Sequence, residues 1–386
     1  MTDDLRVFLL IFFIFSDSLS ITHGVGVGIN YGQIADNLPS PSRVAYLLGS
    51  LNITRVKLYD ADPKVLSAFA GTDIEFVVGL GNEQLQRMTD PAQAQAWIQQ
   101  NIQPYIPRTK IRCITVGNEI LTGSDAGLKT NLLPAMQSVT VALRNLELSD
   151  EIYVTTAHSF DVLGSSYPPS AGMFRQDLAD HVRSILNFHS ENKSPFLINA
   201  YPFFAYKDNP GQIPLDYVLF QPNPGMIDPG TNLHYDNMLY AQIDAVYSAI
   251  KVMGYTDIQV KVSETGWPSK GDPNEIGATL ENARLYNGNL LRRIGRNQGT
   301  PAKPSAPVDI FIFALFNEDL KPGPLSERNY GLYYPDGAPV YSTGLQGYFP
   351  RMDYSGSWRN AGIRLSNLTT FFCLFYFIFY SFMSHL

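Results

Sequence analysis

Eight short runs of β-branched and aliphatic residues alternate with longer stretches of helical periodicity, and this alternation restricts the possible fold more than any other feature. Several runs are almost continuously apolar, as parallel strands covered on both faces are. The predicted strands are residues 25–31, 55–59, 74–80, 111–117, 152–157, 196–201, 258–263 and 310–316. The intervening residues 91–102, 132–146 and 238–253 place apolar side chains three and four apart and are predicted to be helices. Eight strand-then-helix units predict an α/β fold, a single (β/α)8 TIM barrel domain over residues 25–353.

The composition of the chain argues against several classes of function. The 386-residue chain carries a formal charge of −7, so it lacks the clustered cations that nucleic-acid binding needs. Its two cysteines cannot build a disulfide framework or a thiolate zinc site. The six histidines show no metal-ligand spacing, and no glycine-rich phosphate loop is complete, so neither a metal nor a nucleotide cofactor is predicted. Cys113 lies within a predicted strand and is expected to be a buried, inert thiol.

The N-terminal end resembles a secretory signal. Residues 7–15 are an apolar run followed by small and polar residues, so residues 1–24 are predicted to be a signal peptide. The alternative is a buried N-terminal element. Asn52 and Asn192 begin Asn-x-Ser/Thr triplets and are candidate glycosylation sites of a secreted chain, although Pro195 after the second triplet disfavours its use.

The C-terminal end, residues 354–386, resembles a GPI-anchor signal. Residues 371–383 are apolar and aromatic but shorter than the roughly twenty residues that a helix needs to cross hydrocarbon. A polar spacer and small residues precede them, so the anchor would be attached at Asn360 or, as the second choice, at Ser355. A short tail anchor or an unprocessed end is the alternative.

Two glutamates follow predicted strands directly. In a (β/α)8 barrel the residues that act on a substrate project from the carboxyl ends of the strands. Glu119 follows the fourth strand and Glu264 the seventh, so the two should face each other across the barrel mouth. Paired carboxyls of this kind are what cleavage of a glycosidic bond needs. One is neutral and protonates the leaving oxygen, and the other is ionised and attacks or stabilises the oxocarbenium-like centre.

The other Asn-Glu pairs are weaker candidates for catalytic residues, because their positions relative to the predicted strands differ. Glu83 is expected in the first turn of a helix and Glu275 in a loop that opens one, where structural roles suffice. Glu318 ends the eighth strand, with Lys321 in the same loop. The two could form a surface ion pair of small worth or support Glu264, and the residues alone leave both possibilities open.

Aromatic residues also gather at the predicted strand ends. Sugar rings present apolar C–H faces that stack on such side chains, while amides and phenols can meet their hydroxyl groups. Any single aromatic residue is more often part of the packing, so only the cluster as a whole indicates a site that binds sugars. Its members are Tyr31, Tyr59, Tyr201, Phe203, Phe204, Trp267 and Phe316.

Four motifs together closely resemble the plant β-1,3-glucanases of glycoside hydrolase family 17. They are GVGINYGQIADNLPSP (residues 26–41), VGNE (116–119), NAYPFFAY (199–206) and SETGWPS (263–269), and the likeness runs over about residues 27–349. The resemblance implies a (β/α)8 barrel and retaining endohydrolysis of β-1,3-glucan by double displacement. It implies the acid/base at Glu119, the nucleophile at Glu264 and support from Glu318 and Lys321. It places Tyr59, Asn118, Tyr201, Phe204 and Trp267 in the substrate cleft.

Two other functions remain open. A transglycosylase would use the same carboxylates but transfer the sugar to an acceptor, and a surface-tethered protein could bind glucan without turnover. In each case the expected partner is a β-1,3-glucan, and the chain is expected to be a monomer. The two termini predict a secreted protein held at the cell surface by a GPI lipid or located in the cell wall.

Overall fold

The computed structural model describes residues 27–345, and eight parallel strands in them close a barrel. Each overlaps one predicted strand, so the predicted fold class is confirmed. Around the barrel the order is β1-β12-β11-β8-β5-β4-β3-β2, and β1 pairs with both β2 and β12. The bounds are β1 (Gly28–Asn30), β2 (Arg55–Lys57), β3 (Glu75–Leu80), β4 (Lys110–Asn118), β5 (Tyr153–Ser159), β8 (Phe196–Asn199), β11 (Val260–Thr265) and β12 (Ile310–Ile312).

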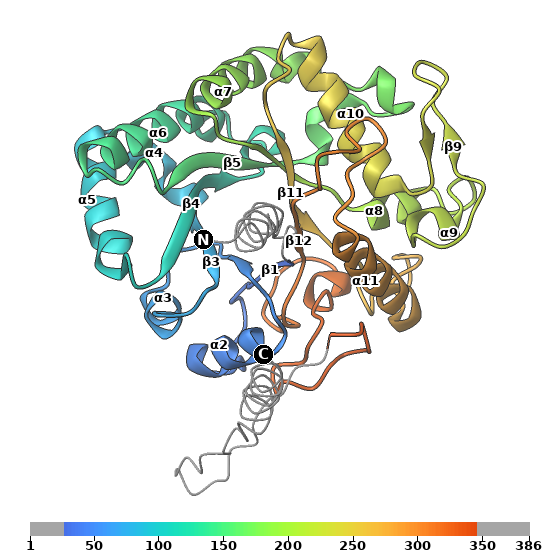
Figure 1. Cartoon of the computed structure of the whole chain (residues 1–386), viewed down its shortest axis with the longest axis horizontal. Coiled ribbons are helices and arrows are strands. Elements are labelled where there is room, and N and C mark those ends of the chain that lie inside the picture. Colours follow the sequence, from blue (N-terminus) through green and yellow to red (C-terminus); the bar gives the residue numbers. More distant parts are fainter. Residues whose placement is uncertain (1–26, 346–386) are drawn as a thin grey trace, which may run out of the picture. The chain divides into compact units, whose positions relative to one another are not determined.

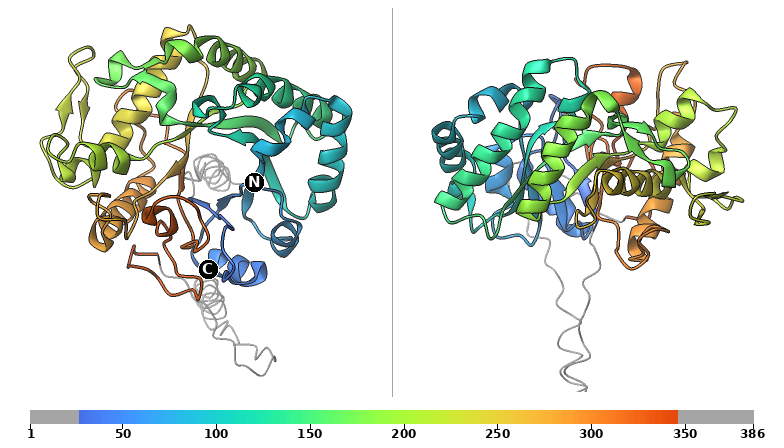
Figure 2. Two further views of the ribbon diagram at one scale, coloured as in Figure 1. Left: turned by 180° about the vertical axis from the view of Figure 1, so that it is seen from behind. Right: turned by 90° about the horizontal axis from the view of Figure 1, so that it is seen from above.

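Helices surround the barrel strands (Figures 1 and 2). They are α2 (Pro41–Ser50), α3 (Pro63–Ala68), α4 (Leu85–Met88), α5 (Pro91–Asn101), α6 (Ala126–Asn145), α7 (Ala179–Asn192), α8 (Pro202–Asp208), α9 (Leu215–Val218), α10 (Met238–Val252) and α11 (Leu280–Gly295). Side-chain N-caps fix many of the starts, because they satisfy backbone N–H groups that have no partner within the helix. These caps are Asp62 for α3, Asp90 for α5, Asp125 for α6, Asn237 for α10 and Thr279 for α11.

The predicted helices are present, and α6 departs most from its predicted bounds. It begins at Ala126 instead of residue 132, because Asp125 accepts a hydrogen bond from the backbone N–H of Leu128 and caps an earlier first turn. Pro134 then lies inside the helix, although proline lacks the N–H that a helix interior uses. Burial of Leu132, Met136 and neighbouring side chains against the barrel stabilises this helix despite the proline.

Successive side chains of β2 and of the residue after it point alternately to the hydrophobic core around the barrel and into the barrel interior. Val56 and Leu58 are fully buried and belong to the main hydrophobic cluster. Lys57 points the opposite way, since it reaches Glu264 on β11, which is not adjacent to β2 in the barrel. Cys113 is fully buried in a second, smaller cluster, as expected, and burial raises the pKa of its thiol to about 12.

The long connection between β8 and α10 contains regular elements of its own. It contains α8, α9 and a two-stranded ribbon formed by β9 (Met226–Ile227) and β10 (His234–Tyr235). Another ribbon, β6 (Leu163–Ser165) with β7 (Met173–Phe174), follows β5. Both insertions lie at the end of the barrel where the carboxyl ends of the strands open, and both border the cavity described below.

The predictions for the two termini lie outside the described residues. They are the signal peptide at residues 1–24 and the C-terminal segment 354–386 with the anchor sites Asn360 and Ser355. Over residues 27–345, none of the helices combines the length and the apolar character that a bilayer crossing requires.

Candidate active site

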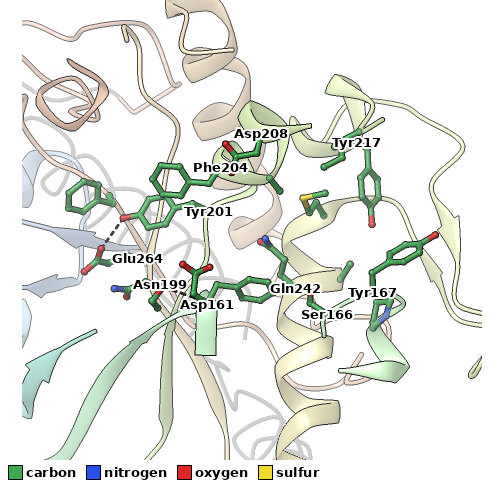
Figure 3. A pocket seen from close by; sticks show the side chains of 18 of the residues that line it. Asp161, Ser166, Tyr167, Asn199, Tyr201, Phe204, Asp208, Tyr217, Gln242 and Glu264 are labelled. Carbon is green, nitrogen blue, oxygen red and sulfur yellow. Dashed lines mark hydrogen bonds between the residues drawn. The ribbon is translucent and has the colours of Figure 1, made fainter. Parts of the chain in front are cut away.

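A cavity of about 1360 Å3 opens at the carboxyl ends of the strands, and Glu119 and Glu264 both line it. Figure 3 shows it as an elongated space with Glu264 at one end and Tyr167 and Tyr217 at the other. The structure thus brings the two predicted glutamates together with the predicted cleft residues Tyr59, Asn118, Tyr201 and Phe204, and with Lys321, which was predicted as a supporting residue.

Glu264 lies near the end of β11, and three side chains hold its carboxylate. Lys57 Nζ lies 2.9 Å from Oε1, the Tyr59 hydroxyl donates to the same oxygen at 2.8 Å, and the Tyr201 hydroxyl donates to Oε2 at 2.9 Å. The residue is only 6% exposed, and burial opposes the charged form. The adjacent Lys57 cation and the hydrogen bonds outweigh burial and hold the pKa of Glu264 below its ordinary value, so the group is ionised and suited to act as a nucleophile.

Glu119 has the opposite electrostatic environment. It follows β4 in a left-handed backbone conformation, with φ of 57°, and its N–H donates to Ala157 O at 2.8 Å. Burial first, and the negative charge of Glu264 second, raise the pKa of Glu119. A hydrogen bond of 2.9 Å from Asn199 Nδ2 to Oε1 only partly offsets them. Two carboxyls with pKa values shifted apart are the pattern of an acid beside a nucleophile.

A buried polar network beneath the carboxyls was missed by the sequence reasoning. Asn199 Oδ1 accepts from Ser263 Oγ at 2.6 Å, and Asn30 Oδ1 lies 3.2 Å from the oxygen of the Tyr59 hydroxyl, whose proton the shorter bond to Glu264 uses. Lys57 was missed as well. Its signal was available, because a lysine that alternates with apolar residues in a central strand must point into the barrel, where a buried cation needs a carboxylate.

Glu318 and Lys321 are both near the site, and of the two possibilities left open, the ion pair between their side chains is not formed. Lys321 lines the cavity, with Nζ 3.2 Å from Glu327 Oε2 and 4.1 Å from the centre of the Phe313 ring. Glu318 is 4% exposed, so it is not a surface contact, and its Oε1 accepts a hydrogen bond from the backbone N–H of Ile34 at 2.8 Å. It therefore ties the loop after β1 to the end of β12.

Trp267 corrects one prediction, because its side chain is fully buried and is not among the residues that line the cavity. Its Nε1 donates to Gly277 O at 2.8 Å, and its ring packs against Phe203 and Tyr286. This tryptophan supports the wall behind the cleft and does not stack on a sugar. Tyr31, Phe203 and Phe316 are buried in the same way, because strand-end aromatics point either into the cavity or into the packing around it.

Asn118 is fixed by its backbone at the end of β4. Its N–H donates to Asn82 Oδ1 at 2.8 Å and its carbonyl accepts from Asn82 Nδ2 at 3.0 Å.

The glutamates of two other Asn-Glu pairs have structural surroundings. Glu83 lies in the first turn of a short 3-10 helix, Asn82–Gln84, and a place in the first turn of a helix was predicted for it. Glu275 accepts hydrogen bonds from the backbone N–H groups of Asp272 and Ser326, so it joins two loops.

The glycosylation candidates differ in their surroundings. Asn52 is exposed in a turn, and its acceptor role stays a prediction. Asn192 donates to Phe188 O at 2.8 Å and accepts from Arg144 at 2.6 Å, while Ser194 of the same triplet is buried. These contacts disfavour modification of Asn192.

Within the described part of the chain, His, Cys, Asp and Glu side chains form no group of three or more that could hold a metal ion.

Replacing Lys57 with Met should move the pH dependence of kcat/KM to higher pH. kcat/KM falls on the acidic side as Glu264 takes up a proton, and Lys57 is the main reason that the pKa of Glu264 lies low. Without this cation, the acidic limb should move by about one to three units to higher pH. The basic limb follows Glu119, whose pKa Lys57 also lowers, so that limb should rise by less. The exposed Lys64 provides the control variant Lys64→Met. An acidic limb that stays in place or moves to lower pH would contradict this electrostatic role.

Comparisons with known proteins agree with this geometry. The model of the family "Glycosyl hydrolases family 17" matches residues 27–345. The chain is 62% identical over 364 residues to glucan endo-1,3-beta-glucosidase 14 of Arabidopsis thaliana, covering 94% of this chain and 92% of the relative. It is 43% identical over 337 residues to glucan endo-1,3-beta-D-glucosidase of Olea europaea, covering 87% and 73%.

The fold agrees as well. A solved β-1,3-glucanase and allergen of Cryptomeria japonica pollen superposes with a TM-score of 0.80 and 41% identity, covering 83% of this chain and 99% of that one. A solved plant β-glucan endohydrolase superposes with a TM-score of 0.76 and 37% identity, covering 82% and 99%. Because the family model matches most of the chain and the identities are this high, the chain belongs to glycosyl hydrolases family 17.

Proposed function

We propose that this protein is a glucan endo-1,3-β-glucosidase that cleaves internal bonds of β-1,3-glucan with retention of configuration. The observation that carries the proposal is the cavity with two carboxyls whose pKa values are shifted in opposite directions, Glu119 upward and Glu264 downward. The similar proteins are named as glucan endo-1,3-β-glucosidases, and these names are the reason for proposing the β-1,3 linkage as the bond that is cleaved.

The reaction has two steps. In the first, Glu264 attacks the anomeric carbon and forms a covalent ester, while the bond to the leaving oxygen breaks and Glu119 gives that oxygen its proton. In the second, Glu119 removes a proton from water, the water oxygen attacks the anomeric carbon, and the bond to Glu264 breaks. The pathway requires carboxyl groups about 5 to 5.5 Å apart, whereas an inverting enzyme needs roughly 6.5 to 9.5 Å.

The donors around Glu264 give it a fixed orientation. Tyr201 bonds Oε2, while Lys57 and Tyr59 bond Oε1, so the carboxylate cannot rotate freely. Holding a nucleophile in the geometry of attack removes orientational entropy from the barrier. The same donors stabilise the carboxylate again when it leaves the sugar in the second step.

The cellular setting is part of the proposal. We infer that the protein is secreted, carries a glycan at Asn52, and is held by a GPI lipid at Asn360 or Ser355 on the outer cell surface or in the cell wall. We further expect it to act as a monomer. Cell-wall β-1,3-glucan would then be the substrate in reach.

Digestion of defined laminari-oligosaccharides tests the activity and separates its rivals. An endohydrolase should release shorter oligosaccharides and one new reducing end for each bond cleaved. A transglycosylase would instead produce chains longer than the starting material, and a binding protein would retain the oligosaccharides unchanged. Either of the last two results as the main outcome would reject the proposed hydrolysis.

A further inference from the structure

A buried carboxylate joins the two insertions that border the cavity. The first insertion is residues 163–174, with β6, β7 and the short 3-10 helix Pro169–Ala171, and the second is residues 226–235, with β9 and β10. Asp228 belongs to the second insertion and is fully buried. Neither the catalytic step nor the packing around the two glutamates uses it.

Hydrogen bonds from both insertions hold the Asp228 carboxylate. Oδ2 accepts from the backbone N–H of Ser170 at 2.7 Å, and Oδ1 accepts from the Ser170 hydroxyl at 2.6 Å. Oδ1 also accepts from the backbone N–H of Gly230 at 2.8 Å, within the second insertion. Ser170 and Asp228 are 58 residues apart in the chain, so the carboxylate connects two segments that are distant in the sequence.

The charge of Asp228 distinguishes it from an ordinary packing residue. Burial alone would raise the pKa of this carboxyl, but hydrogen bonds from Ser170, Gly230 and Thr231 outweigh burial and hold the pKa below its ordinary value. The group is therefore ionised, and its donors are neutral hydroxyl and backbone N–H groups. Burying an ionised carboxylate costs free energy that a neutral side chain would not cost. Its presence indicates a need for position, because one carboxylate can accept from several donors at once and so fix their geometry.

Both ends of this connection lie beside residues that line the cavity. Ser170 directly follows Pro169, and Asp228 lies two residues after Met226; Pro169 and Met226 both line the cavity. Tyr167, also of the first insertion, lies at one end of the cavity (Figure 3). A movement of one insertion relative to the other would therefore change the shape of the cavity wall.

The two insertions have separate attachments to the rest of the fold. In the first, Gly172 lies so close to α10 that a Cβ atom on it would overlap the carbonyl oxygen of Ala245. At the base of the second, Asn223 Nδ2 donates to Asp236 O at 2.9 Å. These attachments do not involve the Asp228 carboxylate, so its contribution is to the link between the insertions.

We propose that Asp228 is a positioning residue that clamps the second insertion to the first and so fixes the cavity wall for the glucan. The proposal rests on the proposed function, in which a glucan chain lies along the cavity. Asp228 itself is buried outside the cavity lining and touches neither the substrate nor the reacting atoms. Without the clamp, only a fraction of the molecules would have the binding arrangement, so the apparent affinity would fall by that fraction while the chemical step stays unchanged.

Asp228→Asn breaks the clamp with little change in shape. The amide has one acceptor oxygen and one donor nitrogen, so in either orientation a backbone N–H, of Ser170 or of Gly230, faces the new NH2 group. Hydrogen–deuterium exchange should then become about threefold to tenfold faster in residues 163–174 and 226–235, the size expected from one lost hydrogen bond. Exchange in β4 and β11, which position the two glutamates, should stay at the parental rate.

Affinity for a long oligosaccharide separates positioning from a purely structural role. In the Glu264→Gln background, calorimetry with laminariheptaose should show an affinity about threefold to tenfold lower for Asp228→Asn. In the active protein, KM for laminariheptaose should rise by the same factor and kcat should stay at the parental value. Unchanged exchange would show that no clamp exists. Faster exchange with unchanged affinity and KM would assign Asp228 to the fold alone, and either result overturns the proposal.

Two further variants complete the test. Ser170→Ala removes only the hydroxyl donor and keeps the backbone N–H bond to Oδ2, so it should change exchange and affinity in the same direction and decides the proposal if Asp228→Asn does not fold. Asp216→Asn is the matched control, because Asp216 is an exposed aspartate of the same connection between β8 and α10 and does not line the cavity. It should leave exchange and affinity at the parental values, and an equal effect in this variant would overturn the clamp.

These measurements also distinguish failure of the clamp from failure of the proposed function. If the parent protein binds laminariheptaose without cleaving it, the proposed function fails, and exchange and affinity still decide the role of Asp228.

Discussion

Glu264→Gln is expected to lower kcat on β-1,3-glucan by at least about 10⁴-fold, because the amide cannot form the glycosyl ester. The fold should survive, since a glutamine keeps the shape of the side chain. Its carbonyl oxygen can accept from Lys57 and Tyr59 in place of Oε1, and its amide N–H can donate to the Tyr201 hydroxyl oxygen in place of Oε2. Circular dichroism and initial rates of reducing-end release measure the two effects. A folded variant with parental turnover would remove Glu264 from the mechanism.

Glu264→Ala should behave differently from Glu264→Gln in stability. Lys57 has a nearly inaccessible side chain, and the alanine leaves its cation buried without a partner. Breaking a buried pair in this way costs about 3–5 kcal/mol of unfolding free energy. Azide provides a further check, because it fits the space left by the missing carboxylate and can attack the anomeric carbon from the same side. Azide should restore turnover to the alanine variant and yield the α-glucosyl azide, whereas a β-azide would place the nucleophile elsewhere.

Glu119→Gln is expected to lose activity according to the leaving group. With the glucan, whose leaving alcohol needs a proton, kcat/KM should fall by about 10²- to 10⁴-fold. With a dinitrophenyl glycoside, whose leaving group needs no proton, the first step should be nearly unaffected and the second step should limit the rate. The basic limb of the pH profile should also disappear, because it reports loss of the raised-pKa proton of Glu119.

Glu83→Gln is the matched control for Glu119→Gln. Glu83 also follows an asparagine, but it is exposed in a short helix. Its variant should hydrolyse both substrates at the parental rate. Equal losses with the glucan and the aryl glycoside in Glu119→Gln would contradict a proton-donor role, since they would indicate a general disturbance of the site.

The barrel could be predicted because its strands have a strong local signal. Strands buried on both faces are continuous apolar runs, and eight of them separated by helical stretches have few ways to pack. The strand ends were less predictable. Of the described residues 27–31 of the first predicted strand, only Gly28–Asn30 belong to β1, because pairing on both sides sets its length. Likewise, the start of α6 depended on the Asp125 cap and not on apolar periodicity.

The catalytic pair could also be predicted, but its surroundings could not. Glu119 and Glu264 are recognisable from their places after strands. The contacts of Lys57 and Asn199 depend on which residues of nonadjacent strands meet across the barrel, and single-strand patterns do not specify this register. Trp267 shows the same limit, because its place after a strand did not reveal that its ring turns into the packing.

The configuration of the first product tests the central claim most directly. Proton NMR during the first minutes of laminari-oligosaccharide cleavage resolves the α and β anomers before they equilibrate. Attack by Glu264 followed by attack of water inverts the anomeric carbon twice, so the β anomer should form first. The α anomer as the initial product would mean a single displacement by water, and Glu264 could not then be the nucleophile.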